Sequence, residues 1–152
     1  MEYHDTRILI ADENQSSRTQ IREALTRAGY RHIEEATGGD DALAKIDRSH
    51  PDIALIDIWL SQLDGIGVIR ACRNLDFRSD HAPVFIMTSP VSNQNMFIQA
   101  AGAGAALCLI KSEFILVIYN DFIIVSAINM IALKFQNDII GICFIDRNAF
   151  TV

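Results

Sequence analysis

The chain has 152 residues and a formal net charge of −6, with 50% hydrophobic and 21% charged residues. This length favours one compact domain over two, and the hydrophobic share is sufficient for a buried core. The acidic balance argues against nucleic-acid binding, because a nucleic-acid-binding surface needs basic residues to displace counterions from phosphate. The three cysteines are far apart and form no CxxC pair, so neither a disulfide framework nor a zinc site is expected.

The first 111 residues alternate between apolar runs and segments of helical periodicity. The apolar runs predict five strands, at residues 7–11, 32–36, 53–58, 84–88 and 105–110. The intervening segments predict helices, one ending at Gly29, one capped by Asp40, one opened by Asp64 and one around residues 93–101. Such an alternation predicts an α/β fold, in which a doubly wound five-stranded parallel sheet lies between two helical layers. The ligand site of this fold lies beyond the carboxyl ends of the strands.

Polar residues suited to binding a metal and a phosphoryl group follow four of the five predicted strands. Asp12 and Glu13 follow the first strand, Asp57 lies near the end of the third, Thr88 ends the fourth, and Lys111 follows the fifth. Three carboxylates that lie close together repel one another, so a divalent cation is expected among them, and hard oxygen ligands suit Mg²⁺. A carboxylate beside Mg²⁺ can attack phosphorus while the metal and a lysine neutralise the charge of the transferring group.

In these segments the sequence resembles the receiver domain of response regulators, the phosphate-accepting proteins of two-component signalling. The matching segments are ILIADEN, IALIDIWLSQLDG, VFIMTS and AGAGAALCLIK, at residues 8–14, 53–65, 84–89 and 101–111. Each segment alone is a weak signal, whereas the ordered set is specific. The resemblance covers the predicted domain core, residues 6–111, and implies a flavodoxin-like receiver fold of the chemotaxis-regulator type.

The resemblance also implies a role for each polar residue at the strand ends. Asp57 would accept phosphate from the phosphohistidine of a histidine kinase or a phosphotransfer protein. Mg²⁺ would be held by four groups, the carboxylates of Asp12, Glu13 and Asp57 and the main-chain carbonyl of Trp59. Thr88 would move toward the phosphoryl group, and Lys111 would form an ion pair with the phosphorylated site.

Within residues 6–111, three positions depart from the usual family pattern. Family members usually have a proline four residues after the phosphate acceptor, where this chain has Ser61. Glu13 is one methylene longer than the more common aspartate, which would shift the metal slightly. An aromatic residue that changes rotamer on activation is usual in the fifth strand, where this chain has Cys108. We therefore expect phosphate acceptance to be intact and the route from phosphorylation to an output to be altered.

Residues 112–152 form an atypical hydrophobic C-terminal segment that does not match the family. Residues 114–135 are apolar nearly all round, where an amphipathic fifth helix is expected. Three interpretations are open: a membrane span, a β-hairpin turning at Asn120–Asp121, or a helix buried in a homodimer interface. We favour the helix, because the fold needs one to cover that face of the sheet. Asp121 opposes insertion into a bilayer and disfavours the span.

One function is preferred over two alternatives. The preferred function is a receiver that accepts phosphate on Asp57 with Mg²⁺ and switches a protein–protein interaction, catalysing only its own phosphorylation and dephosphorylation. The first alternative is a degenerate receiver that acts only as an interaction or dimerisation module. The second is a small Mg²⁺-dependent phosphohydrolase, which Trp59 disfavours because such enzymes usually have an aspartate there. The polar N-terminal sequence MEYHDTR lacks a signal-peptide pattern, so a cytoplasmic location is expected.

Overall fold

The structure is a computed structural model that describes residues 5–74, 82–91, 93–111 and, by their backbone alone, 143–144. The strands are β1 (Arg7–Ala11), β2 (His32–Ala36), β3 (Ile53–Asp57), β4 (Val84–Ser89), β5 (Ala105–Ile110) and β6 (Cys143–Phe144). The helices are α1 (Gln15–Arg27), α2 (Gly39–Ser49), α3 (Gly65–Asn74) and α4 (Gln94–Ala103). The strand order is β2-β1-β3-β4-β5-β6, and every neighbouring pair is parallel. The predicted five-stranded parallel sheet is confirmed, and the two-residue strand β6 extends it beside β5.

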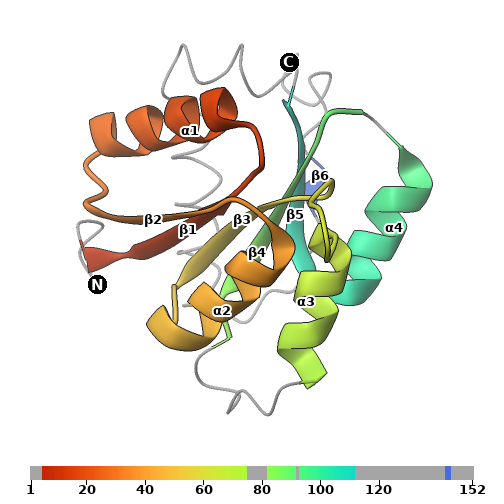
Figure 1. Ribbon diagram of the computed structural model, residues 1–152. Coiled ribbons are helices and arrows are strands. Elements are labelled where there is room, and N and C mark those ends of the chain that lie inside the picture. The colour runs from red at the N-terminus through yellow and green to blue at the C-terminus, as the bar shows by residue number, and fades with distance from the viewer. Residues whose placement is uncertain (1–4, 75–81, 92, 112–142, 145–152) are drawn as a thin grey trace.

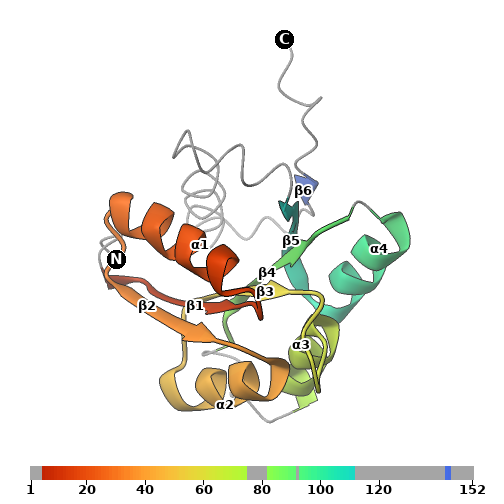
Figure 2. The same ribbon diagram turned by 45° about the horizontal axis from the view of Figure 1, so that its top comes forward.

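Alternate residues of the central strands supply the two buried faces of the sheet. Ile8 and Ile10 of β1 belong to one hydrophobic cluster with Leu25 of α1, whereas Leu9 belongs to the other cluster with Ile46 of α2. Figure 1 shows α1 on one face and α2 and α3 on the other, and Figure 2 shows the same layers from another direction. Because both faces are covered by helices, strands β1 and β3 are almost entirely apolar.

The helix starts follow local side-chain chemistry, with one exception. Asn14 caps α1 and Asn93 caps α4, each accepting a hydrogen bond from a main-chain N–H three residues later. Asp64 likewise accepts from Gly67 N at 2.6 Å, as expected for a cap. The predicted cap at Asp40 is wrong, because α2 begins at Gly39 and its N-cap is Gly38.

The reason for the earlier start is a close approach between two loops. A Cβ atom on Gly39 would lie 1.7 Å from the main-chain oxygen of Leu63, so only glycine fits at this first helical position. Asp41 then accepts a hydrogen bond from Thr37 N at 3.1 Å, which satisfies a donor before the helix. The start of α2 is therefore set by the loop after β3 rather than by a capping side chain.

Two of the three cysteines have described side chains, and both are free thiols. Cys72 in α3 is buried, and Cys108 in β5 is partly buried against the same hydrophobic cluster. Burial raises the pKa of each thiol to about 11, so both stay protonated at neutral pH. Cys108 pairs in register with Met87 of β4, which leaves a small apolar side chain where family members usually have an aromatic one.

Several expectations concern residues outside the described ranges. The three interpretations of residues 114–135 lie there, and so does the proposed homodimer contact. Among the described residues, no helix combines the length and the apolar character that crossing a bilayer requires.

Candidate functional site

The site forms where the strand order changes direction, between β1 and β3. The chain passes from β1 to β2 on one side and then returns to β3 on the other, and ligands of open α/β sheets bind beyond the carboxyl ends of the strands at such a point. Asp12 follows β1 directly and Asp57 is the last residue of β3. Thr88 of β4 is the in-register neighbour of Asp57. The topology therefore brings three of the predicted residues to adjacent strand ends.

A buried ion-pair cluster joins Asp12, Asp57 and Lys111. The Lys111 Nζ atom lies 2.7 Å from Asp12 Oδ2 and 2.5 Å from Asp57 Oδ2. Asp12 is 2% exposed and Asp57 is 5% exposed, so both carboxylates are nearly removed from water. Because a buried charge is costly unless it is paired, the ammonium group between the two carboxylates lowers the free-energy cost of burying them.

The surroundings shift the pKa values of Asp57 and Lys111. Burial raises the pKa of the Asp57 carboxyl above its usual value, against hydrogen bonds from Lys111 and from the Trp59 main chain. Burial alone would lower the pKa of Lys111, but its hydrogen bonds to Asp12 and Asp57 together raise that pKa. Lys111 therefore remains positively charged between the two carboxylates at neutral pH.

Short hydrogen bonds orient the two buried carboxylates. Asp12 accepts from Asn14 N at 2.8 Å through Oδ1 and from the Ser17 hydroxyl at 2.7 Å through Oδ2. Asp57 accepts from Trp59 N at 3.1 Å through Oδ1. The oxygens of both residues are thus fixed in direction before any ligand binds.

Thr88 and Trp59 flank Asp57 with different exposure. Thr88 is buried, and its main-chain oxygen accepts a hydrogen bond from Ile58 N at 2.9 Å. Trp59 leaves 59% of its surface exposed on the loop after β3. Thr88 therefore belongs to the interior of the site, whereas the indole lies at its rim.

Glu13 does not join the buried cluster. Its carboxylate accepts a hydrogen bond from the main-chain N–H of Ser61, in the loop after β3. Hydrogen bonds from the side chain and from the main chain of Ser61 lower the pKa of Glu13, which stays ionised at the surface. Within the described ranges, no group of three or more Asp, Glu, His or Cys side chains is arranged to hold a metal ion. Asp12 and Asp57 offer oxygen ligands around a cation, and Glu13 lies apart from them.

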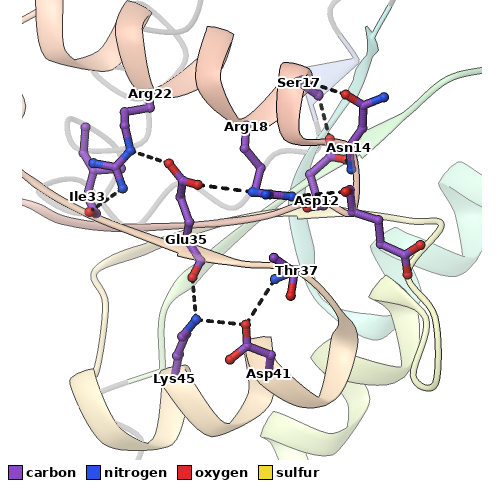
Figure 3. Close-up of polar contacts among 11 residues, drawn as sticks. Asp12, Asn14, Ser17, Arg18, Arg22, Ile33, Glu35, Thr37, Asp41 and Lys45 are labelled. Atoms are coloured by element: carbon purple, nitrogen blue, oxygen red, sulfur yellow. Dashed lines mark hydrogen bonds and ion pairs between the residues drawn. The ribbon is translucent and has the colours of Figure 1, made fainter.

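Arg18, which was not predicted as a site residue from the sequence, supports the loop that carries Asp12 and Glu13. Figure 3 shows Arg18 of α1 beneath this loop, between Asp12 and Glu35 of β2. Arg18 Nη1 donates to the main-chain oxygens of Asp12 at 2.6 Å and Glu13 at 3.1 Å. Its Nε donates to Glu35 Oε2 at 3.2 Å. The loop that carries both acidic residues is therefore tied through Arg18 to strand β2.

Glu35 is the centre of this second network. Its carboxylate also accepts from Arg22, and its main-chain oxygen accepts from Lys45 Nζ at 2.6 Å (Figure 3). A signal for Arg18 was present in the sequence, because it continues the apolar stripe of Ile21 and Leu25 at helical spacing. A charged residue at such a position needs a buried partner, and here the partners are carbonyl oxygens and a carboxylate.

The comparisons with known proteins agree with this geometry. A family model described as the response regulator receiver domain matches residues 8–117. The chain belongs to this family. The receiver is 30% identical over 126 residues to chemotaxis protein CheY of Thermotoga maritima, covering 83% of this chain and 97% of that protein. It is 31% identical over 105 residues to CheY of Bacillus subtilis, covering 69% of this chain and 84% of that protein.

Solved receiver structures share the fold. The NarL receiver domain of Mycobacterium tuberculosis matches with a TM-score of 0.63 and 27% identity, over 70% of this chain and 83% of that one. A LuxR-family response regulator of Aurantimonas matches with a TM-score of 0.69 and 25% identity, over 82% and 83%. CheY of Borrelia burgdorferi, in a complex with CheX, BeF3 and Mg, matches with a TM-score of 0.62 and 22% identity, over 69% and 77%. The last match supports the fold alone.

Proposed function

We propose that this receiver accepts a phosphoryl group on Asp57, in a Mg²⁺-dependent reaction, from the phosphohistidine of a histidine kinase or a phosphotransfer protein. The observation that carries the proposal is the Asp57 carboxylate, which is buried at a strand end, oriented by Trp59 N and neutralised by Lys111. A carboxylate positioned in this way can act as a nucleophile toward phosphorus.

The transfer requires one bond to form and one to break. An Asp57 oxygen attacks phosphorus, and the bond between phosphorus and the histidine nitrogen breaks with its electron pair left on the imidazole. The imidazole takes its proton from solvent and leaves neutral. The Lys111 ammonium, which already lies against Asp57, neutralises negative charge on the product, and the Thr88 hydroxyl donates to a phosphoryl oxygen.

The residues at the site fit Mg²⁺ in part. Bound Mg²⁺ supplies Lewis-acid stabilisation of the phosphoryl oxygens. Asp12 and Asp57 already share a cation, the Lys111 ammonium, and their hard oxygens suit this metal. We assign the further ligands to Glu13, after it leaves Ser61, and to the main-chain carbonyl of Trp59.

The output that we propose is a change in affinity for a protein partner in the cytoplasm. CheY of Borrelia burgdorferi, which has the same fold, is found in a complex with the protein CheX, so this fold can present a protein-binding surface. We expect no turnover of separate phosphoester substrates, since Trp59 stands where phosphohydrolases of this chemistry usually have an aspartate. Nucleic-acid binding is not expected from a chain with a net charge of −6.

The test is phosphorylation by acetyl phosphate, read by intact-protein mass spectrometry with and without Mg²⁺. The wild type should gain one phosphoryl group only with Mg²⁺, and Asp57→Asn should gain none. Asp64→Asn is the matched control, because Asp64 is a nearby carboxylate that caps a helix, and this variant should still be labelled. Equal labelling of wild type and Asp57→Asn would contradict the proposal. A wild type that takes no label would favour the interaction-only module.

A further inference from the structure

Two departures from the family pattern contact each other in the structure. The side chain of Glu13, which is longer than that of the usual aspartate, accepts a hydrogen bond from the main-chain N–H of Ser61, and the Ser61 side chain is a second partner. Family members usually have proline at the Ser61 position, and proline has no N–H to donate. The contact therefore depends on Ser61 not being proline, and it joins residues that are 48 positions apart.

The loop after β3 holds the Ser61 main chain in place. The Ser61 carbonyl accepts from Leu63 N at 2.8 Å and from Gly39 N at 3.4 Å, which ties this turn to the start of α2. Gln62, between Ser61 and Leu63, has a left-handed φ of 67°. These hydrogen bonds hold the Ser61 carbonyl in a tight turn, which restrains the main chain that presents the N–H to Glu13.

We propose that the Ser61 N–H holds Glu13 out of the metal site, so that Mg²⁺ binds only as this hydrogen bond breaks. The inference rests on the proposed Mg²⁺-dependent function and assigns Ser61 as the positioning residue that sets the metal affinity. Asp12 and Asp57 face one cation in the buried cluster, whereas Glu13 is turned to the rim. A receiver with this contact therefore requires a higher Mg²⁺ concentration for phosphate acceptance on Asp57 than a receiver with proline at the Ser61 position.

The physical reason is an exchange of partners. A charged carboxylate that accepts an amide hydrogen bond loses that bond when it turns to a metal, and the loss reduces the net gain of binding. Mg²⁺ also demands near-ideal octahedral geometry and gives up its waters reluctantly, so an absent protein ligand weakens binding. Replacing Ser61 by proline removes the N–H and frees Glu13 for the metal, and it leaves every side chain that would bind the metal unchanged.

The experiment measures the Mg²⁺ dissociation constant of the full chain from the midpoint of a Trp59 fluorescence titration. Ser61→Pro, which removes both the N–H and the hydroxyl group, is expected to tighten Mg²⁺ binding about three- to tenfold, the range that corresponds to the net contribution of one intramolecular hydrogen bond. Ser61→Thr keeps both the main-chain N–H and a hydroxyl group and is the matched control, with the wild-type midpoint expected. Equal midpoints for all three proteins would overturn the inference while leaving the proposed Mg²⁺ site intact.

A second background separates the hydrogen bond from stiffening of the loop. Glu13→Asp shortens the side chain, which should no longer reach Ser61, so this variant alone is expected to bind Mg²⁺ more tightly than the wild type. Ser61→Pro added to Glu13→Asp should then change the midpoint little. An equal gain from Ser61→Pro in both backgrounds would assign the effect to loop rigidity and overturn the inference.

If Ser61→Pro does not fold, a Glu13→Asp midpoint equal to or weaker than wild type overturns it instead. A wild type that binds no Mg²⁺ removes the proposed function and this inference together.

Discussion

Buried charge at the strand ends is the main feature at the scale of single residues. Asp12 and Asp57 are both nearly buried, and Lys111 is the cation that pairs with them. Replacing a buried ion pair by apolar side chains is often neutral or stabilising, so such a pair is weak evidence for a stabilising role. The cluster is better explained by the charge that the proposed phosphate transfer would need at this site.

Glu35 is a charged residue whose role is structural and whose effect depends on pH. Its hydrogen bonds with Arg22 and Arg18 lower the pKa of this carboxyl. The stabilisation is therefore present above the pKa of Glu35 in the unfolded chain, and it is lost as the pH falls through the lower folded-state value. At neutral pH, Glu35→Gln should reduce the free energy of unfolding by about 0.5–1.5 kcal/mol, the net range for an intramolecular hydrogen bond.

Urea denaturation at neutral and at acid pH measures this effect. The stability difference between wild type and Glu35→Gln should shrink as the pH falls below the depressed pKa. Glu23→Gln on the exposed face of α1 is the control and should stay close to the wild type throughout. A difference that is the same at both pH values would show that the ionised carboxylate is not the source.

At the scale of elements, the start of α2 and the loop after β3 approach so closely that glycine is required. The main-chain oxygen of Leu63 occupies the position that a Gly39 side chain would need, and the Ser61 carbonyl accepts from Gly39 N. The same loop carries Trp59 and the N–H that binds Glu13. The packing of α2 against this loop therefore helps to position the rim of the site.

Two glycine substitutions test this packing, because they are expected to change the stability of the protein in opposite directions. Gly39→Ala should destabilise the protein by about 1–3 kcal/mol or more, because backbone must move to admit the new Cβ. Gly102 lies within α4, and no atom of the residues that the structure describes lies within 4 Å of where its Cβ would be, so Gly102→Ala should stabilise the protein by up to about 1 kcal/mol. Thermal unfolding followed by circular dichroism gives both values. Equal shifts in the two variants would contradict the close contact at Gly39.

At the scale of the whole molecule, the site joins segments that are far apart along the chain. Lys111 lies 99 positions from Asp12 and 54 from Asp57, and the three meet only when β1, β3 and β5 stand in one parallel sheet. A ligand that binds this arrangement binds the folded chain and not the unfolded one. Metal binding should therefore stabilise the entire domain.

Mg²⁺ should raise the unfolding temperature through this linkage. At a concentration of 100 times the dissociation constant, the expected stabilisation is about 2.7 kcal/mol, which corresponds to roughly 5–10 °C for a domain of this size. Asp12→Asn should lose most of the shift. Asp52→Asn is the control, since Asp52 pairs with Arg7 before β3 begins and should keep the full shift. Equal shifts in both variants would place the metal elsewhere.

The sequence by itself determined the five parallel strands, the family and the residues at the strand ends. This was possible because continuous apolar runs indicate strands covered on both faces, and a parallel sheet collects its strand ends at one edge. The same reasoning placed Asp12, Asp57 and Lys111 in one site before their distances were known. The cap at Asp64 was equally predictable, because capping depends on neighbours in the sequence.

Only the tertiary structure decided which partners the remaining polar groups take. Glu13 turns to Ser61, Arg18 turns to the acidic loop, and α2 starts at Gly39 rather than behind a cap at Asp40. Each outcome depends on how closely a distant loop or helix approaches, and periodicity carries no information on that distance. Local patterns therefore fixed the positions of the acidic residues, and non-local packing fixed the direction in which Glu13 points.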